Sequence, residues 1–243
     1  MPRDVPRLYV PIPMHQGMIL TLEDAQAHYL LHVMRMHVGS ALHIFYDDAG
    51  EWLARVVSCS RKTLHIEIVE RVLPPQLSPD VWLLSAPIKG KRMEYIIEKA
   101  TELGVRKVVL VRTERTIAAH LSEDRLHAHA IEAAQQCERR DVPKIVPIQP
   151  LAYILEHWDA HRPLLYGDET GAGMRADRAM AGLTYPLALL IGCEGGFAAH
   201  ELEMLRAHPA TIPLHLGEQI LRADTATIAA LTLVQHYSAL SLL

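Results

Sequence analysis

Two apolar segments near the C-terminal end of the chain constrain its fold more than any other feature. Residues 187–192 and 211–216 each end at or beside a glycine, and each is followed by a loop and a helical pattern. Strand, glycine turn and helix, twice in succession, is typical of an α/β protein that binds its ligand at the carboxyl ends of its strands. Gly195 and Gly196 would let backbone approach a bulky ligand. The turn fits neither GxGxxG nor GxxxxGKS/T, so the usual dinucleotide and P-loop fingerprints are absent.

The same alternation extends over most of the chain. Strands are predicted over 81–86, 107–112, 144–148 and 163–166, and helices over 92–103, 122–140 and 224–240. Strands that alternate with helices predict a parallel sheet with helices on both faces.

The first 72 residues show a different pattern. Short strands are predicted over 7–10, 41–46, 51–58 and 63–72, with one helix that begins at Thr21, carries Asp24 in a capping-box position and runs to about Met36. Residues 73–80 contain three prolines and are expected to be a linker. We therefore predict two domains, a small β-barrel over 1–73 and an α/β domain over 81–243.

The charge of the chain is unevenly distributed. The net charge is −4, but residues 86–115 hold eight Lys and Arg against four Asp and Glu, whereas residues from 151 onward hold five against ten. A local basic stripe of this kind is compatible with RNA binding. No run approaches the roughly 20 apolar residues of a membrane span, and the N-terminus lacks an apolar signal core, so we expect a cytoplasmic protein.

Cysteine and histidine spacing gives no reason to expect a disulfide framework or a bound metal. The three cysteines form no CxxC pattern, and Cys193 in the glycine loop is expected to be a small buried residue. His157 and His161 have helical spacing, but no glutamate base lies between them, and we interpret them as part of a solvated face.

Six short motifs, in order along nearly the whole chain, resemble those of one family. The two C-terminal ones read IGCEGGF from Ile191 and LGEQILRADTA from Leu216. The other four lie at residues 28–39, 90–105, 113–116 and 135–143. Together they resemble the RsmE family of 16S ribosomal RNA methyltransferases of the SPOUT class. The chain departs from the family pattern at Cys193, where proline is expected, at Gln219, where arginine is expected, and at Asp224, where glutamate is expected.

The resemblance implies much that periodicity does not show. It implies a PUA-like N-terminal β-barrel, a SPOUT α/β domain with a trefoil knot, and a homodimer. It also implies S-adenosylmethionine as cofactor and methylation of N3 of a uridine in 16S rRNA, within the small ribosomal subunit. Two alternatives stay open: a SPOUT methyltransferase acting on another RNA, and a catalytically silent RNA-binding factor of ribosome assembly.

The motifs also carry site residues. We expect the cofactor to contact Leu165, Gly192, Glu194, Gly195, Gly196, Leu216, Gly217, Ile220, Leu221 and Arg222. Methyl transfer depends mainly on positioning, and the attacking uracil N3 must lose a proton. Glu194 and Asp224 are the candidates in the loops to accept it, although Asp224 also suits a helix N-terminus. Arg139 and Arg222 could stabilise negative charge on the uracil.

RNA contacts are expected from four arginines, Arg35, Arg92, Arg115 and Arg139. Arg35 could equally be a plain surface residue. Arg139 is expected to act on the uracil bound by the partner chain of the homodimer.

Overall fold

The computed structural model describes residues 5–117 and 121–240, with side chains up to residue 237 in the last helix. The chain forms two compact units. One consists of residues up to 77 together with 134–141, and the other of 78–133 and 142 onward. The sequence predicted a single division at residues 73–80, and it did not predict that residues 134–141 belong to the first unit. Residues 1–4 and 241–243 of the predicted domains lie outside the described residues.

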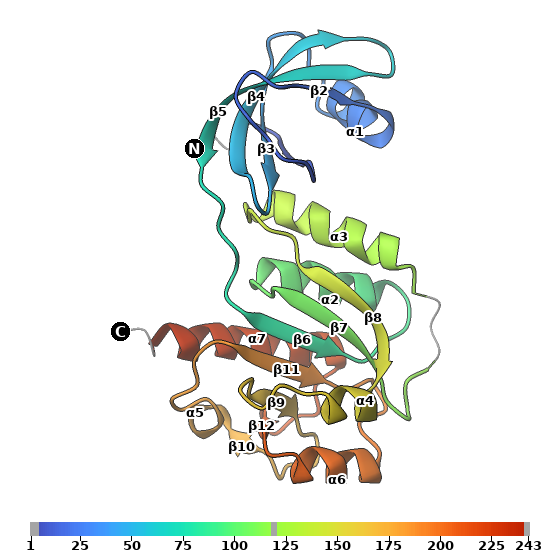
Figure 1. The fold of residues 1–243 in the computed structure, drawn as a ribbon. Coiled ribbons are helices and arrows are strands. Elements are labelled where there is room, and N and C mark those ends of the chain that lie inside the picture. Colours follow the sequence, from blue (N-terminus) through green and yellow to red (C-terminus); the bar gives the residue numbers. More distant parts are fainter. Residues whose placement is uncertain (1–4, 118–120, 241–243) are drawn as a thin grey trace. The chain divides into compact units, whose positions relative to one another are not determined.

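The N-terminal unit is built on a five-stranded sheet in the order β1-β3-β4-β5-β2 (Figure 1). Its strands are β1 (Arg7–Tyr9), β2 (Ile19–Leu22), β3 (Ala41–Tyr46), β4 (Gly50–Cys59) and β5 (Leu64–Leu73). β1 pairs with β3 in parallel and the other neighbours are antiparallel. Leu64, Ile66 and Ile68 of β5 are fully buried, as their alternation with polar residues predicts.

The predicted helix start at Thr21 is wrong. Thr21 lies in β2, which pairs with β5, and its hydroxyl contacts the His65 ring at 3.0 Å. The helix α1 (Asp24–His28) begins three residues later and continues as the π-helical turn η1 (Tyr29–Val33). Leu20 and Leu22 are buried on either side of Thr21, so the alternation of a strand decides this segment rather than the capping pattern.

The C-terminal unit contains a seven-stranded parallel sheet in the order β10-β12-β9-β11-β6-β7-β8. Its strands are β6 (Val81–Ser85), β7 (Lys107–Arg112), β8 (Lys144–Pro150), β9 (Leu164–Gly167), β10 (Met174–Arg175), β11 (Leu187–Ile191) and β12 (Thr211–His215). Its helices are α2 (Lys91–Glu102), α3 (Glu123–Gln136), α4 (Leu151–Glu156), α5 (Ala176–Ala179), α6 (Ala199–Ala207) and α7 (Ala223–Leu240). The last residues of α3, from Ala134, belong to the first unit. The predicted α/β fold class, with a small β unit and a parallel-sheet unit, is confirmed. The trefoil knot stays a prediction.

Helices cover the parallel sheet because its central strands β6, β7, β9 and β11 are apolar and mostly buried on both faces. Leu164 and Tyr166 of β9 join one buried cluster with side chains of α4 and α6. Leu165, the residue between them, points to the opposite face by the alternation of a strand and is fully buried. α2 and α7 pack against each other, and α7 contacts β11 (Figure 1).

Several boundaries differ from the predicted ones. α3 ends at Gln136 rather than near residue 140, and Glu138 just beyond it has a left-handed backbone with φ of 62°. The short elements β10, α4 and α5 were not predicted. α4 ends at Glu156, so His157 and His161 do not share a helix face.

Candidate functional site

A cavity of about 520 Å³ lies in the C-terminal unit where three neighbouring strands end. β9 lies between β12 and β11 in the sheet, and the loops that follow these three strands form the walls. The first residues of α7 complete the cavity. The lining residues are Gly167–Gly171, Ile191–Glu194, Gly196, Leu214–Ala223 and Ala226.

The cavity includes most of the residues predicted to hold a cofactor. Gly192, Glu194, Gly196, Leu216, Gly217, Ile220, Leu221 and Arg222 all line it. Leu165 does not, because it points into the core from the middle of β9. Gly195 also lies outside the lining, and a β-carbon built on it would lie 3.2 Å from the Arg115 side chain.

The third wall of the cavity, formed by the last residue of β9 and the loop after it (residues 167–171), was missed by sequence reasoning. It carries Asp168 and Glu169 directly after Gly167. A glycine at the end of a predicted strand, the same pattern as at the other two loops, could have indicated this wall from the sequence. The Glu169 carboxylate accepts a hydrogen bond from the Phe197 N–H at 3.0 Å. This bond joins the loop after β9 to the glycine loop after β11.

Gly196 is required by this junction. Its φ is +68°, a left-handed conformation that residues with a side chain rarely adopt. A β-carbon at this position would also collide with the Glu169 carboxylate. The predicted role of the glycine pair in a close backbone approach therefore applies to Gly196, although the group that approaches it here is a protein side chain.

Asp168 is the buried acidic residue of the cavity wall. One of its oxygens, Oδ1, accepts hydrogen bonds from the Thr170 N–H at 2.9 Å and the Thr170 hydroxyl at 2.6 Å. The other oxygen, Oδ2, is buried and has no hydrogen-bond partner among the described residues. The nearest cation is the Arg206 guanidinium, 3.7 Å from Oδ2 and about half exposed. Burial, followed by the nearby negative charge of Asp168, raises the pKa of the adjacent Tyr166 hydroxyl.

Arg92 at the start of α2 lies between the two carboxylates that were considered as proton acceptors. Its guanidinium lies 3.8 Å from Glu194 and 3.9 Å from Asp224. Asp224 is in the first turn of α7, and its carboxylate accepts the Thr225 N–H at 2.8 Å. This position supports the helix N-terminal interpretation of Asp224. Glu194 lines the cavity and Asp224 does not.

Arg115 is also tied to the glycine loop. It follows β7 and donates a hydrogen bond to the Gly195 carbonyl at 2.8 Å. Arg92 and Arg115, which were predicted to contact RNA, therefore both touch the loop after β11.

The two neutral departures from the family motifs lie in different surroundings. Cys193 is buried, where its sulfur accepts a hydrogen bond from the Thr113 hydroxyl at 3.8 Å and donates to the Gly196 carbonyl at 3.8 Å. Gln219 is exposed on the cavity rim beside Ile220, whose side chain is 85% exposed. The cysteine at the first position is therefore packed in the interior, and the glutamine at the second leaves the rim position without a charge.

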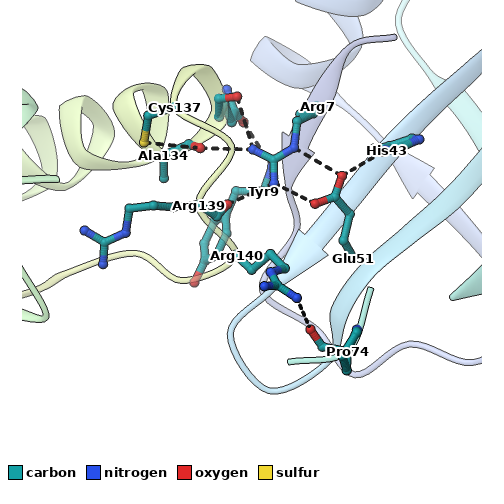
Figure 2. A network of polar contacts seen from close by, with 10 residues as sticks. Arg7, Tyr9, His43, Glu51, Pro74, Ala134, Cys137, Arg139 and Arg140 are labelled. Atoms are coloured by element: carbon teal, nitrogen blue, oxygen red, sulfur yellow. Dashed lines mark hydrogen bonds and ion pairs between the residues drawn. The ribbon is translucent and has the colours of Figure 1, made fainter. Parts of the chain in front are cut away.

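Arg139 belongs to the N-terminal unit. It was predicted to act on the uracil, and its guanidinium forms two hydrogen bonds to the Asp141 carboxylate, at 3.1 and 3.0 Å, with both side chains nearly buried. Figure 2 shows that the Arg139 backbone is held as well, because its carbonyl accepts a hydrogen bond from Arg7 at 2.9 Å. Arg35, the other arginine of this unit that was predicted to contact RNA, is exposed and has a left-handed φ of 53°.

Neither a metal site nor a membrane span is found in the described part of the chain. Across residues 5–117 and 121–240, no three His, Cys, Asp or Glu side chains gather closely enough to hold a metal ion. Over the same residues, every helix is too short or too polar to cross a membrane.

Comparison with family models gives two matches. Residues 75–235 match the model of an RNA methyltransferase domain, and residues 22–69 match an RNA methyltransferase PUA domain. Among curated relatives, ribosomal RNA small subunit methyltransferase E of Rickettsia conorii is 28% identical, over 94% of each chain. The protein of the same name from Synechocystis sp. is 30% identical, over 87% of this chain and 71% of the relative.

Two of the solved structures that share the fold are described as methyltransferases with bound cofactor. A structure described as a methyltransferase from Legionella pneumophila with bound cofactor SAM is 27% identical, covers 96% of this chain and 97% of its own, and has a TM-score of 0.85. Ribosomal RNA small subunit methyltransferase E from Neisseria gonorrhoeae, bound to S-adenosyl methionine, is 24% identical with the same coverage and a TM-score of 0.84.

Proposed function

The chain belongs to the RNA methyltransferase family, and from this membership we propose its reaction. It has an RNA methyltransferase domain and a PUA domain, as in ribosomal RNA small subunit methyltransferase E. It is an S-adenosylmethionine-dependent rRNA methyltransferase, and we propose N3 of a uridine in 16S rRNA as the atom that it methylates. The observation that carries the proposal is the cavity at the ends of β9, β11 and β12, because two of its three loops hold the C-terminal family motifs.

The residues of the cavity fit S-adenosylmethionine. Its volume of about 520 Å³ lies within the range of about 300 to 1,000 Å³ that small-molecule sites occupy. Ile220 and Leu221 offer apolar surface to an adenine, and backbone groups of the loop after β12 can read its polar edge. Acidic side chains lie on the wall after β9, which suits the cationic end of the cofactor. When bound, S-adenosylmethionine supplies a methyl group on a positively charged sulfur.

Positioning dominates the catalysis that the chain itself provides. The loops must hold the methyl group in line with N3, because such alignment alone lowers the barrier strongly. As the N3–C bond forms and the S–C bond breaks, the N3 proton must leave. Glu194 is the carboxylate of the lining that we propose to accept it. Arg222 lines the same cavity, and we propose that it stabilises the negative charge that develops on the uracil oxygens.

We also propose that the enzyme works as a cytoplasmic homodimer on the small ribosomal subunit, and that its cofactor loops form a trefoil knot. The N-terminal unit would bind RNA through Arg35, and Arg92 and Arg115 would bind it beside the glycine loop. In this arrangement the partner chain lends Arg139 to the site. Asp141 supports that role because it holds the Arg139 guanidinium in one orientation.

The test is methyl transfer from labelled S-adenosylmethionine to small subunits, free 16S rRNA and tRNA. Labelling of small subunits or 16S rRNA, together with a stop of reverse transcriptase at one uridine, is the expected result, because an N3 methyl blocks the pairing edge of the base. Labelling of tRNA alone would favour another RNA substrate. Binding of RNA with no transfer to any of the three would favour the silent assembly factor.

A mixed dimer tests the shared site. Gly196→Val should destroy a chain's own cofactor cavity, and Arg139→Ala should remove what a chain lends to its partner. Each homodimer should then be nearly inactive, whereas a heterodimer purified through two different tags contains one complete site and should recover part of the activity. A heterodimer as inactive as both homodimers would show that Arg139 acts within its own chain.

A further inference from the structure

The charges that line the cavity are strongly biased. Asp168, Glu169, Glu194 and Glu218 contribute four carboxylates, against the single guanidinium of Arg222. Three of the four carboxylates are on exposed residues, where water screens them. Asp168 is the exception, with a side chain that is 1% exposed. The electrostatic effect on a bound ligand should therefore be concentrated at Asp168, because charges interact most strongly where water is excluded.

Asp168 also has one oxygen that the protein leaves without a hydrogen bond. Thr170 occupies Oδ1 with two hydrogen bonds, which fixes the orientation of the carboxylate, while Oδ2 has no such partner among the described residues. Burying an ionised oxygen without a partner is costly, so such an oxygen calls for an explanation. Arg206 compensates only in part, because its guanidinium is 3.7 Å away and about half exposed.

We propose that Asp168 is the residue by which this cavity distinguishes the methyl donor from the demethylated product. The inference rests on the proposed function. S-adenosylmethionine carries a positive charge on sulfur, and S-adenosylhomocysteine does not, although both carry the same ammonium and carboxylate groups. A buried carboxylate near the sulfur stabilises the donor alone, and that attraction ends when the methyl group leaves. Asp168 thereby favours binding of the donor and release of the product.

A different arrangement, in which Asp168 lies beside the ammonium group of the ligand instead of its sulfur, makes a different prediction. If Oδ2 paired with the ammonium, Asp168 would stabilise donor and product equally, because both carry that group. The ratio of the two dissociation constants therefore separates discrimination at the sulfur from simple binding of the amino-acid end.

The experiment is calorimetric titration of the full-length protein with S-adenosylmethionine and with S-adenosylhomocysteine. Asp168→Asn removes the charge and keeps the shape and the Oδ1 acceptor for Thr170. Donor affinity should fall by about tenfold to a hundredfold, the loss expected for a buried charged contact, while product affinity changes by less than about twofold. Glu218→Gln, which removes an exposed carboxylate of the same cavity, is the matched control and should leave the ratio unchanged.

Arg206→Gln provides a test of opposite sign that does not depend on the Asp168 variant being well folded. Removing the cation beside Oδ2 should increase the preference for the donor. An unchanged donor-to-product ratio in both Asp168→Asn and Arg206→Gln would overturn the proposal, whether or not the individual affinities fall. Failure of the wild-type protein to bind either compound would instead refute the proposed function, so the two failures are distinguishable.

Discussion

Replacing Arg7 by methionine should destabilise the N-terminal unit more than any change of an exposed arginine. Figure 2 shows the Arg7 guanidinium surrounded by acceptors. It donates to the Glu51 carboxylate at 3.2 and 2.8 Å and to three carbonyls at and beyond the end of α3, those of Ala134, Gln135 and Arg139, at 3.0, 3.2 and 2.9 Å. The guanidinium also lies 4.5 Å from the centre of the Phe45 ring. One side chain therefore joins two strands of the unit to the residues that carry Arg139.

The magnitude follows from what the substitution leaves behind. Glu51 is only 4% exposed in its side chain, and without Arg7 its nearest remaining partner is the His43 ring at 2.6 Å. Breaking a buried ion pair by removing one member costs about 3 to 5 kcal/mol. The lower end applies because His43 remains, so we expect a loss of about 3 kcal/mol. For a chain of this size that corresponds to a fall in Tm of about 6 to 12 °C.

The assay is thermal and urea unfolding at pH 7, with Arg61→Met, an exposed arginine of the same unit, as the control. The control should change the free energy of unfolding by less than about 0.5 kcal/mol. Combining Arg7→Met with Glu51→Gln removes the stranded charge and should restore about half of the loss, because only the carbonyls then lack their donor. A loss below about 1 kcal/mol for Arg7→Met, or a double variant no more stable than the single one, would refute the buried-charge reasoning.

Three further predictions follow from the same structure. Burial by itself raises the pKa of Glu51, but the hydrogen bonds and charges of Arg7 and His43 outweigh burial and lower the pKa. Ionised Glu51 therefore stabilises the folded protein at pH values above its unfolded pKa of about 4.3. This stabilisation is lost as the pH falls through the lower pKa of the folded state. Urea unfolding from pH 7 to pH 3 should therefore show the stability difference between wild type and Glu51→Gln shrinking with acidification, and a constant difference would contradict it. Gly196→Ala should weaken S-adenosylmethionine binding, measured by calorimetry, at least about tenfold. An alanine in this left-handed backbone conformation is strained by about 1 to 3 kcal/mol, and its β-carbon collides with Glu169. Gly195→Ala is the control and should have a smaller effect. Arg92→Gln combined with Arg115→Gln should reduce the salt dependence of RNA binding by about one to two units of slope, and an unreduced slope would place the RNA elsewhere.

The sequence by itself determined the main divisions of this protein. Alternation of Leu64, Ile66 and Ile68 predicted one buried face of a strand, and all three are buried because side chains on a strand point alternately to its two faces. The glycines after residues 187–191 and 211–216 predicted two loops at a ligand site, and both loops line the same cavity. Periodicity and turn chemistry are local properties, so they can be read without the fold.

Only the tertiary structure decided which distant segments meet. β9 precedes β11 and β12 in the chain but lies between them in the sheet, so its following loop becomes a third wall and brings in Asp168. No local pattern reports strand order, because pairing depends on long-range packing. For the same reason the sequence could not show that Leu165 faces the core, or that Asp141 and Arg7 hold Arg139. A hydrogen bond between residues 132 positions apart exists only once the sheet and the helix end have been brought together.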